Sequence, residues 1–181
     1  WSYAGIIISS VYLLMTLYNK SLVRKTFEHQ LSQEGIEYKR IFTTPTFLNN
    51  ILWFCVAEIE GGYLHGYISL LDDDGVKVPL VESRGNHELT EEIEDVRLRS
   101  TLSWFSNGYY LVEKSAADQW TWKDLRFGDN DFAGEGEGRF FFHFMIEHRD
   151  GKFTMYQNRE VDQAMGPVFK EFWKRLKGLK E

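Results

Sequence analysis

Four side chains in the segment QWTWKDLRFG (residues 119–128) have the types and spacing that could bind an anion. Alternate residues of a strand point to one face of a sheet, and four residues would share such a face here: Trp120, Trp122, Asp124 and Arg126. A guanidinium offers paired donors that match a carboxylate or phosphate, and an indole ring can wall the site. We predict a ligand-binding site at these residues; the alternative is a salt bridge between Asp124 and Arg126.

The other reactive residues form no familiar catalytic or metal-binding pattern. The five histidines include no HExxH pair, and the chain holds no Cys/His cluster and no G-x-S-x-G elbow. The segment DDDG (72–75) places its glycine too early for an EF-hand loop, which favours a hairpin turn. The acidic segment GDNDFAGEGEG (128–138) would repel phosphate; it indicates a loop, with a weak divalent-cation site as the alternative. We therefore assign no catalytic or metal-ligating residue to this chain.

The elements that must position these residues alternate between strand and helix patterns. Hydrophobic periodicity and turn residues predict an α+β fold, with an antiparallel sheet of six or seven strands, two to three packed helices and an apolar N-terminal helix. The predicted strands cover residues 51–59, 63–71, 76–80, 109–114, 119–128, 139–148 and 152–157, and the predicted helices cover 90–108 and 167–177. Residues 43–50 are expected to form a loop, and Asp150-Gly151 is expected to form a hairpin turn.

The first 18 residues carry no charge and are apolar around the whole circumference of a helix. At about 1.5 Å per residue they would reach roughly 27 Å, slightly less than the hydrocarbon core of a bilayer. They are either a membrane span or a helix buried in a soluble core. We expect three parts: a membrane span at 1–18, the last span of a longer protein; an amphipathic linker helix at 19–42; and a soluble domain at 43–181. Basic residues directly after the apolar run predict a cytoplasmic domain: Lys20, Arg24 and Lys25.

Charge and cysteine content exclude some classes of protein. The formal net charge of -6 opposes general nucleic-acid binding, which depends on basic side chains that neutralise phosphates. The single cysteine, Cys55, allows no internal disulfide and lies in an apolar strand, where we expect an inert thiol. A chain that opens on Trp1 is expected to be a fragment or a processed product.

Four segments together carry a resemblance to a known family: TTPTFLNNILWFCVAE, GYLHGYISLLD, LSWFSNGYYLVEK and DLRFGD. The chain resembles the soluble C-terminal part of membrane-bound metal-dependent hydrolases, the LexA-binding, inner-membrane-associated hydrolase family, over about residues 1–128. The resemblance implies a bacterial inner membrane and a divalent metal in the full-length protein. It also implies that the metal ligands belong to membrane helices upstream, so that none falls on a residue of this chain.

Two functions are expected from these observations. The first is the cytoplasmic domain of a membrane-bound metal-dependent hydrolase, which contacts the lipid bilayer through residues 1–18 and is not catalytic alone. The second is a non-enzymatic module that binds a ligand or a protein partner on the aromatic sheet face around Trp122. A complete small enzyme is disfavoured because no catalytic constellation is present. No cofactor is expected within this chain, and the substrate and oligomeric state stay open.

Overall fold

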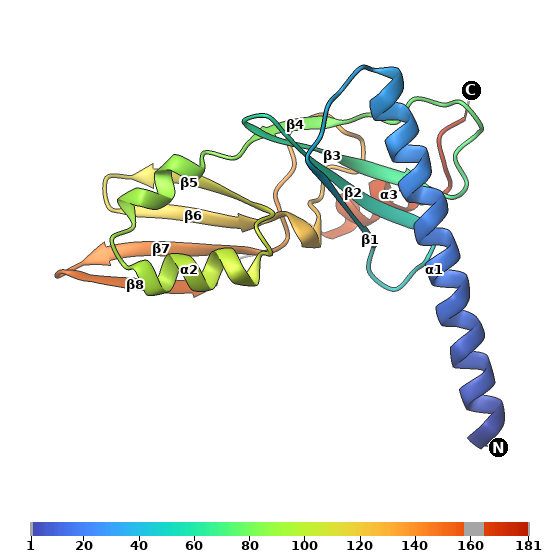
Figure 1. Ribbon diagram of the computed structural model, residues 1–181, viewed down its shortest axis with the longest axis horizontal. Coiled ribbons are helices and arrows are strands. Elements are labelled where there is room, and N and C mark those ends of the chain that lie inside the picture. Colours follow the sequence, from blue (N-terminus) through green and yellow to red (C-terminus); the bar gives the residue numbers. More distant parts are fainter. Residues whose placement is uncertain (1, 158–164, 181) are drawn as a thin grey trace.

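Two four-stranded antiparallel sheets make up the body of the protein. The computed structural model describes residues 2–157 and 165–180, and Figure 1 shows the sheets side by side with a long helix standing at one edge. The first sheet has the order β1-β2-β3-β4: Arg40–Pro45, Leu52–Ile59, Gly62–Ser69 and Val81–Arg84. The second has the order β5-β6-β7-β8: Tyr110–Ala116, Gln119–Asp124, His143–Arg149 and Lys152–Gln157. The helices are α1 (Ser2–Gln33), α2 (Val96–Phe105) and α3 (Met165–Leu176), with 3-10 turns η1 (His87–Glu92) and η2 (Leu125–Phe127).

The α+β class is confirmed, but the prediction of one sheet of six or seven strands is wrong. Between β4 and β5 the chain runs through η1 and α2, and β5 then starts a separate sheet. The predicted loop at 43–50 is also wrong in part, because Thr43, Thr44 and Pro45 pair with β2 as the end of edge strand β1. An edge strand tolerates a proline, which lacks the N–H that a central position requires. Residues 76–80 form no strand, and β4 begins at Val81.

Helix α1 has two halves in opposite environments. Its C-terminal half packs on the first sheet, where Val23, Phe27 and Leu31 are buried against β2 and β3. Its N-terminal half projects beyond the body (Figure 1) and exposes a large apolar side chain on every side: Tyr3, Ile6, Ile7, Ile8, Val11, Tyr12, Leu13, Leu14, Met15, Leu17 and Tyr18. The stretch Tyr3–Gln33 is long and apolar enough to cross a membrane, and its most apolar window is only 6% buried.

Strand β2 is the centre of the first sheet and is covered on both faces, as its continuous apolar sequence predicts. Its odd-numbered residues Trp53, Cys55 and Ala57 face α1. Its even-numbered residues face a second core, which contains Tyr63, Tyr67, Tyr109, Leu125, Phe132, Phe140 and Leu176. The second sheet has its own core under η1 and α2, where Ile93 and Leu102 pack on the sheet.

Two predicted helices differ from the structure at their ends. The helix predicted at 90–108 starts only at Val96, because the Asp95 carboxylate caps it by accepting from Leu98 N at 2.9 Å. The sequence also offers Thr90 as a cap at the predicted start, but its hydroxyl donates to His87 O within η1 at 2.6 Å. The amphipathic pattern of residues 167–177 predicts Phe169, Trp173 and Leu176 on the inner face, but only Leu176 of the three is buried, and Phe169 and Trp173 are exposed. The Asp150-Gly151 turn is confirmed, with φ of 51° and 71°.

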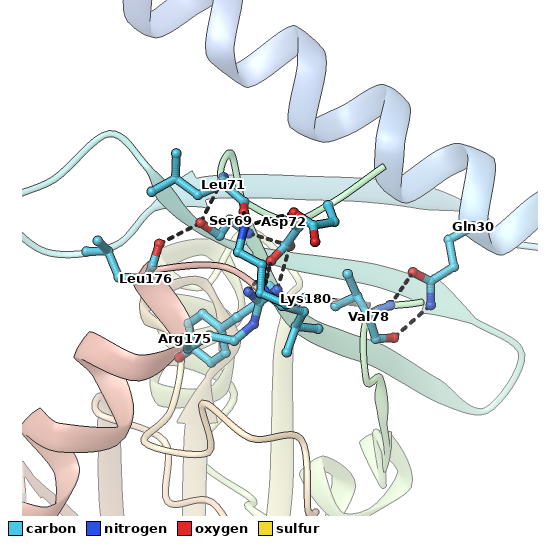
Figure 2. A network of polar contacts seen from close by, with 11 residues as sticks. Gln30, Ser69, Leu71, Asp72, Val78, Arg175, Leu176 and Lys180 are labelled. Atoms are coloured by element: carbon cyan, nitrogen blue, oxygen red, sulfur yellow. Dashed lines mark hydrogen bonds and ion pairs between the residues drawn. The ribbon is translucent and has the colours of Figure 1, made fainter. Parts of the chain in front are cut away.

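A buried ion pair fixes the C-terminal segment to the first sheet, as Figure 2 shows. Arg175 donates from Nη1 to Asp72 Oδ1 at 2.6 Å and from Nη2 to Asp72 Oδ2 at 2.8 Å, and it also donates to Tyr67 O. Ser69 Oγ donates to Leu176 O at 2.7 Å. The DDDG turn thus uses its first carboxylate to hold α3, rather than to bind a cation.

Candidate functional site

Asp124 and Arg126 form the ion pair that the alternative sequence interpretation describes. Arg126 lies in η2, directly after β6, and donates to the carboxylate of Asp124 from Nε at 3.0 Å and from Nη2 at 2.7 Å. The Asp124 side chain is fully buried, and the Arg126 side chain is 22% exposed. Arg126 Nη2 also donates to Phe105 O at the end of α2. The pair therefore ties the second sheet to α2, and an anion would have to displace Asp124 to gain both donors.

The two tryptophans predicted to wall the site lie under cover. Trp120 is 4% exposed and Trp122 is not exposed. The indole of Trp122 stacks on Tyr110 with ring centroids 3.9 Å apart, and its Nε1 donates to Ser106 Oγ at 3.0 Å. Both rings belong to the core between the second sheet and α2. The structure brings these residues together, and binding of a ligand to them stays a prediction.

An arginine that the sequence interpretation passed over faces a groove beside Trp122. The groove holds about 510 Å³ and is lined by residues of η1, α2 and the second sheet: Thr90, Arg99, Ser100, Ser103, Trp104, Asn107, Tyr110 and Trp122. Arg99 makes no ion pair with any residue in 2–157 or 165–180. The side chain of Trp104, which also lines the groove, is 81% exposed. Arg99 and Ser103 are four residues apart on one face of α2, which is the signal that could have identified them.

A second polar cluster joins the first sheet to the loop 128–140. His65 Nδ1 lies 3.3 Å from Asp129 Oδ2, and His65 Nε2 lies 3.0 Å from Ser83 Oγ. The backbone N–H of Asp129 donates to Tyr67 Oη at 2.9 Å, and Tyr67 Oη in turn donates to Asp129 O. The sequence gives no sign of this cluster because its members come from β3, β4 and a loop more than forty positions later.

The cluster has the order of a serine–histidine–aspartate triad, but its surroundings favour a structural role. His65 and Asp129 are 4% and 2% exposed in their side chains, and the rings of Phe54 and Phe140 lie against His65 with centroids at 5.7 and 5.3 Å. Burial lowers the pKa of His65 to about 4 and raises the pKa of Asp129 to about 7. Both groups are therefore pushed toward their neutral forms, which suits a buried hydrogen bond better than a base that must accept protons.

The acidic loop is folded around one of its own carboxylates. Asp131 accepts from the backbone N–H groups of Gly134, Glu135 and Gly136 at 2.8, 2.9 and 2.6 Å. In the part of the chain that the structure describes, no three His, Cys, Asp or Glu side chains are placed to hold a metal ion. The loop therefore supplies a closed turn above the His65 cluster.

The Asp129 carboxyl predicts a pH-dependent difference between wild type and Asp129→Asn. The folded pKa of about 7 lies above the ordinary value of 3.8, so the stabilisation from Asp129 is complete at low pH and is lost as the pH rises through about 7. Wild type should thus gain stability relative to the variant as the pH falls from about 7 to about 4, by up to about 1.4 kcal/mol per pH unit.

Guanidinium unfolding of the full chain in detergent micelles, repeated across that pH range, measures this difference. The lowered pKa of His65 gives the opposite trend with pH, and because His65 contacts Asp129, the difference between the two proteins reports on this pair. A stability difference that does not change with pH would show that the Asp129 carboxyl stays ionised in the folded protein.

Comparisons with known proteins give no further guide to this domain. No protein-family model, no curated protein and no solved structure matches the chain. What the domain does is therefore inferred from its own residues.

Proposed function

We propose that this chain is a membrane-anchored domain, with residues 1–18 in a lipid bilayer and the α+β body at its surface. The observation that carries the proposal is the exposure of eleven large apolar side chains on all sides of one half of α1. A patch of that extent in water is unfavourable, because each Å² of apolar surface costs roughly 25 cal/mol when it is hydrated. A bilayer covers every side of a helix at once.

The ends of the apolar stretch fit the two boundaries of a bilayer. Tyr3 and Tyr18 are 81% and 64% exposed, and tyrosines prefer the interface between hydrocarbon and water. Lys20, Arg24 and Lys25 follow directly, which favours a cytoplasmic body by the positive-inside rule. We place the domain at the cytoplasmic face of a bacterial inner membrane.

The alternative of a helix buried in a soluble core has less support. Such a helix would be mostly covered by its own domain, whereas only 6% of the apolar window is buried. A removable signal sequence is also disfavoured, because the same uninterrupted helix continues into the residues that pack on the first sheet, Val23, Phe27 and Leu31.

The chemistry that we propose for the intact protein is metal-dependent hydrolysis. The support is the resemblance of four segments, from TTPTFLNN to DLRFGD, to membrane-bound hydrolases of that class. The same resemblance implies that the divalent metal is held by membrane helices upstream of this chain, so no step is assigned to a side chain here. We expect the intact protein to hydrolyse its substrate in the presence of a divalent metal, and we expect this chain alone to show no such activity.

Two arginines at the middle of the span test the anchoring proposal. Ile8→Arg and Val11→Arg together should release the chain from membranes into the alkaline-extractable fraction, because each charge at the centre of a span opposes insertion by about 2.5–3.5 kcal/mol. The matched control is Ser32→Arg with Gln33→Arg, two exposed positions of the same helix beyond the span. If the double arginine variant at 8 and 11 stays as firmly in the membrane as the control, the anchor lies elsewhere.

A second candidate function is the binding of a small organic anion in the Arg99 groove. Its volume of about 510 Å³ is in the range of small-molecule sites, and it combines a cation, hydroxyl groups and an exposed indole. These groups suit a ligand that joins a flat ring to a phosphate or carboxylate. This candidate corresponds to the binding-module alternative, with Arg99 in the place that the sequence interpretation gave to Arg126.

Phenyl phosphate is a suitable probe for the groove, since it joins a ring to an anion. Titration calorimetry on the full chain in micelles should detect binding, and Arg99→Gln should weaken the affinity about tenfold or more through loss of a charged hydrogen bond. Arg97→Gln, an exposed arginine on the same helix outside the groove lining, should leave the affinity unchanged. Equal effects of the two variants, or no binding to wild type, would contradict this function.

A further inference from the structure

The loop between β1 and β2 is a rigid structure built around Asn49. The Asn49 side chain accepts from Ile51 N at 2.9 Å and from Leu52 N at 2.8 Å through Oδ1. It donates from Nδ2 to Thr46 Oγ1 at 2.6 Å, while Thr46 N donates to Leu52 O at 2.9 Å. The tip of the loop, Phe47 and Leu48, is thus held in place from both sides.

The tip presents two large apolar side chains outward. Phe47 is 84% exposed and Leu48 is 88% exposed, which makes them the two most exposed large apolar residues in the described part of the chain. Leu48 also has a φ of 57°, in the left-handed region that a leucine seldom adopts. Strained backbone that the surrounding bonds enforce is frequent where a segment has a function.

The position of the loop along α1 indicates what covers this tip. Asn50 Nδ2 donates to Thr16 Oγ1 at 3.0 Å, and Asn19 Nδ2 donates to Asn50 O at 3.4 Å. The loop therefore rests on α1 between the last apolar turn and Lys20, the level at which the proposed span leaves the bilayer. Figure 1 shows this loop beside the middle of α1, at the end of the first sheet that lies toward the projecting half of the helix.

We infer that Phe47 and Leu48 insert into the bilayer interface beside α1, as a second membrane contact of the domain. The inference rests on the proposed anchoring by residues 1–18 and adds a site that the helix alone does not require. Its occupant is the same leaflet that the helix leaves, because Asn50, two residues after the tip, is bonded to α1 at Thr16, within the proposed span. Apolar side chains at that depth are buried among headgroups and upper acyl chains.

The second contact sets the orientation of the body. A single helix permits rotation about its axis and tilt against the membrane, whereas a helix and a loop tip together define one face. The first sheet is then held with its Thr46–Asn50 end on the lipid and its Glu60–Gly61 turn away from it, since these turns lie at opposite ends of β2.

Cysteine labelling can locate the tip, because the single native cysteine is buried and unreactive. Cys55 is fully buried, and burial raises the pKa of its thiol far above the ordinary value. Three variants carry a polarity-sensitive fluorophore on a new cysteine: Phe47→Cys at the tip, Leu14→Cys in the proposed span, and Glu60→Cys at the opposite, exposed turn of the same sheet. The full chain is reconstituted in phosphatidylethanolamine and phosphatidylglycerol vesicles that contain lipids with a quencher near the headgroup.

Quenching of the label at position 47 should exceed quenching at position 60 several-fold. Of these two labels, only the one at position 47 should show blue-shifted emission. Strong quenching or a buried signal at 14 together with an aqueous signal at 47 would overturn the second contact and leave the anchoring intact. Aqueous signals at both 14 and 47 would overturn the anchoring itself.

Discussion

The packing of one half of α1 against the first sheet is the constraint on which the rest of the structure depends. Val23, Phe27 and Leu31 are almost completely buried there. Gln30 adds a pair of hydrogen bonds with the backbone of Val78, donating to its carbonyl at 2.8 Å and accepting from its N–H at 3.0 Å. Because the helix is continuous, the grip on residues 23–31 also fixes the direction of the exposed half. The body and the proposed span therefore behave as one rigid unit.

Three largely buried carboxyl groups help to join the remaining elements: two have a partner from another segment, and the third, Asp124, holds the nearby Arg126, which also donates to Phe105 O of α2. Asp72 holds Arg175 of α3, Asp129 of the acidic loop meets His65 of β3, and Asp124 at the end of β6 holds Arg126. A buried charge is costly unless it is paired, so the Asp72–Arg175 and Asp124–Arg126 ion pairs specify the arrangement of the chain more than they add stability. Arg99 takes part in none of these contacts, and its side chain lines the groove beside α2.

The sequence predicts those features that depend on local pattern. The α+β class, the doubly covered strand β2 and the Asp150-Gly151 turn all follow from periodicity and turn chemistry. The linker helix predicted at 19–42 is right only as far as Gln33, because residues 40–42 pair with β2 as part of strand β1. The division into two sheets does not, because pairing between strands is decided by the path of η1 and α2. The His65 cluster and the Arg99 groove were not predicted from the sequence for a similar reason, because their residues come from separate segments that meet only in the folded protein. The role of Arg126 depended on how deeply Asp124 is buried, which spacing alone does not report.

A lipid-accessibility scan along α1 is the most direct test of this account. Single spin labels at successive positions from 6 to 31, in vesicles, would be measured for collision with oxygen, which enters lipid, and with a water-soluble nickel complex. A membrane-embedded first half of α1 should give uniform lipid exposure on every face up to about residue 17, a change to water between 17 and 20, and then an alternation with the helical period. The same alternation from the start of the scan would mean that a protein covers one side of the helix, and would contradict the membrane anchor.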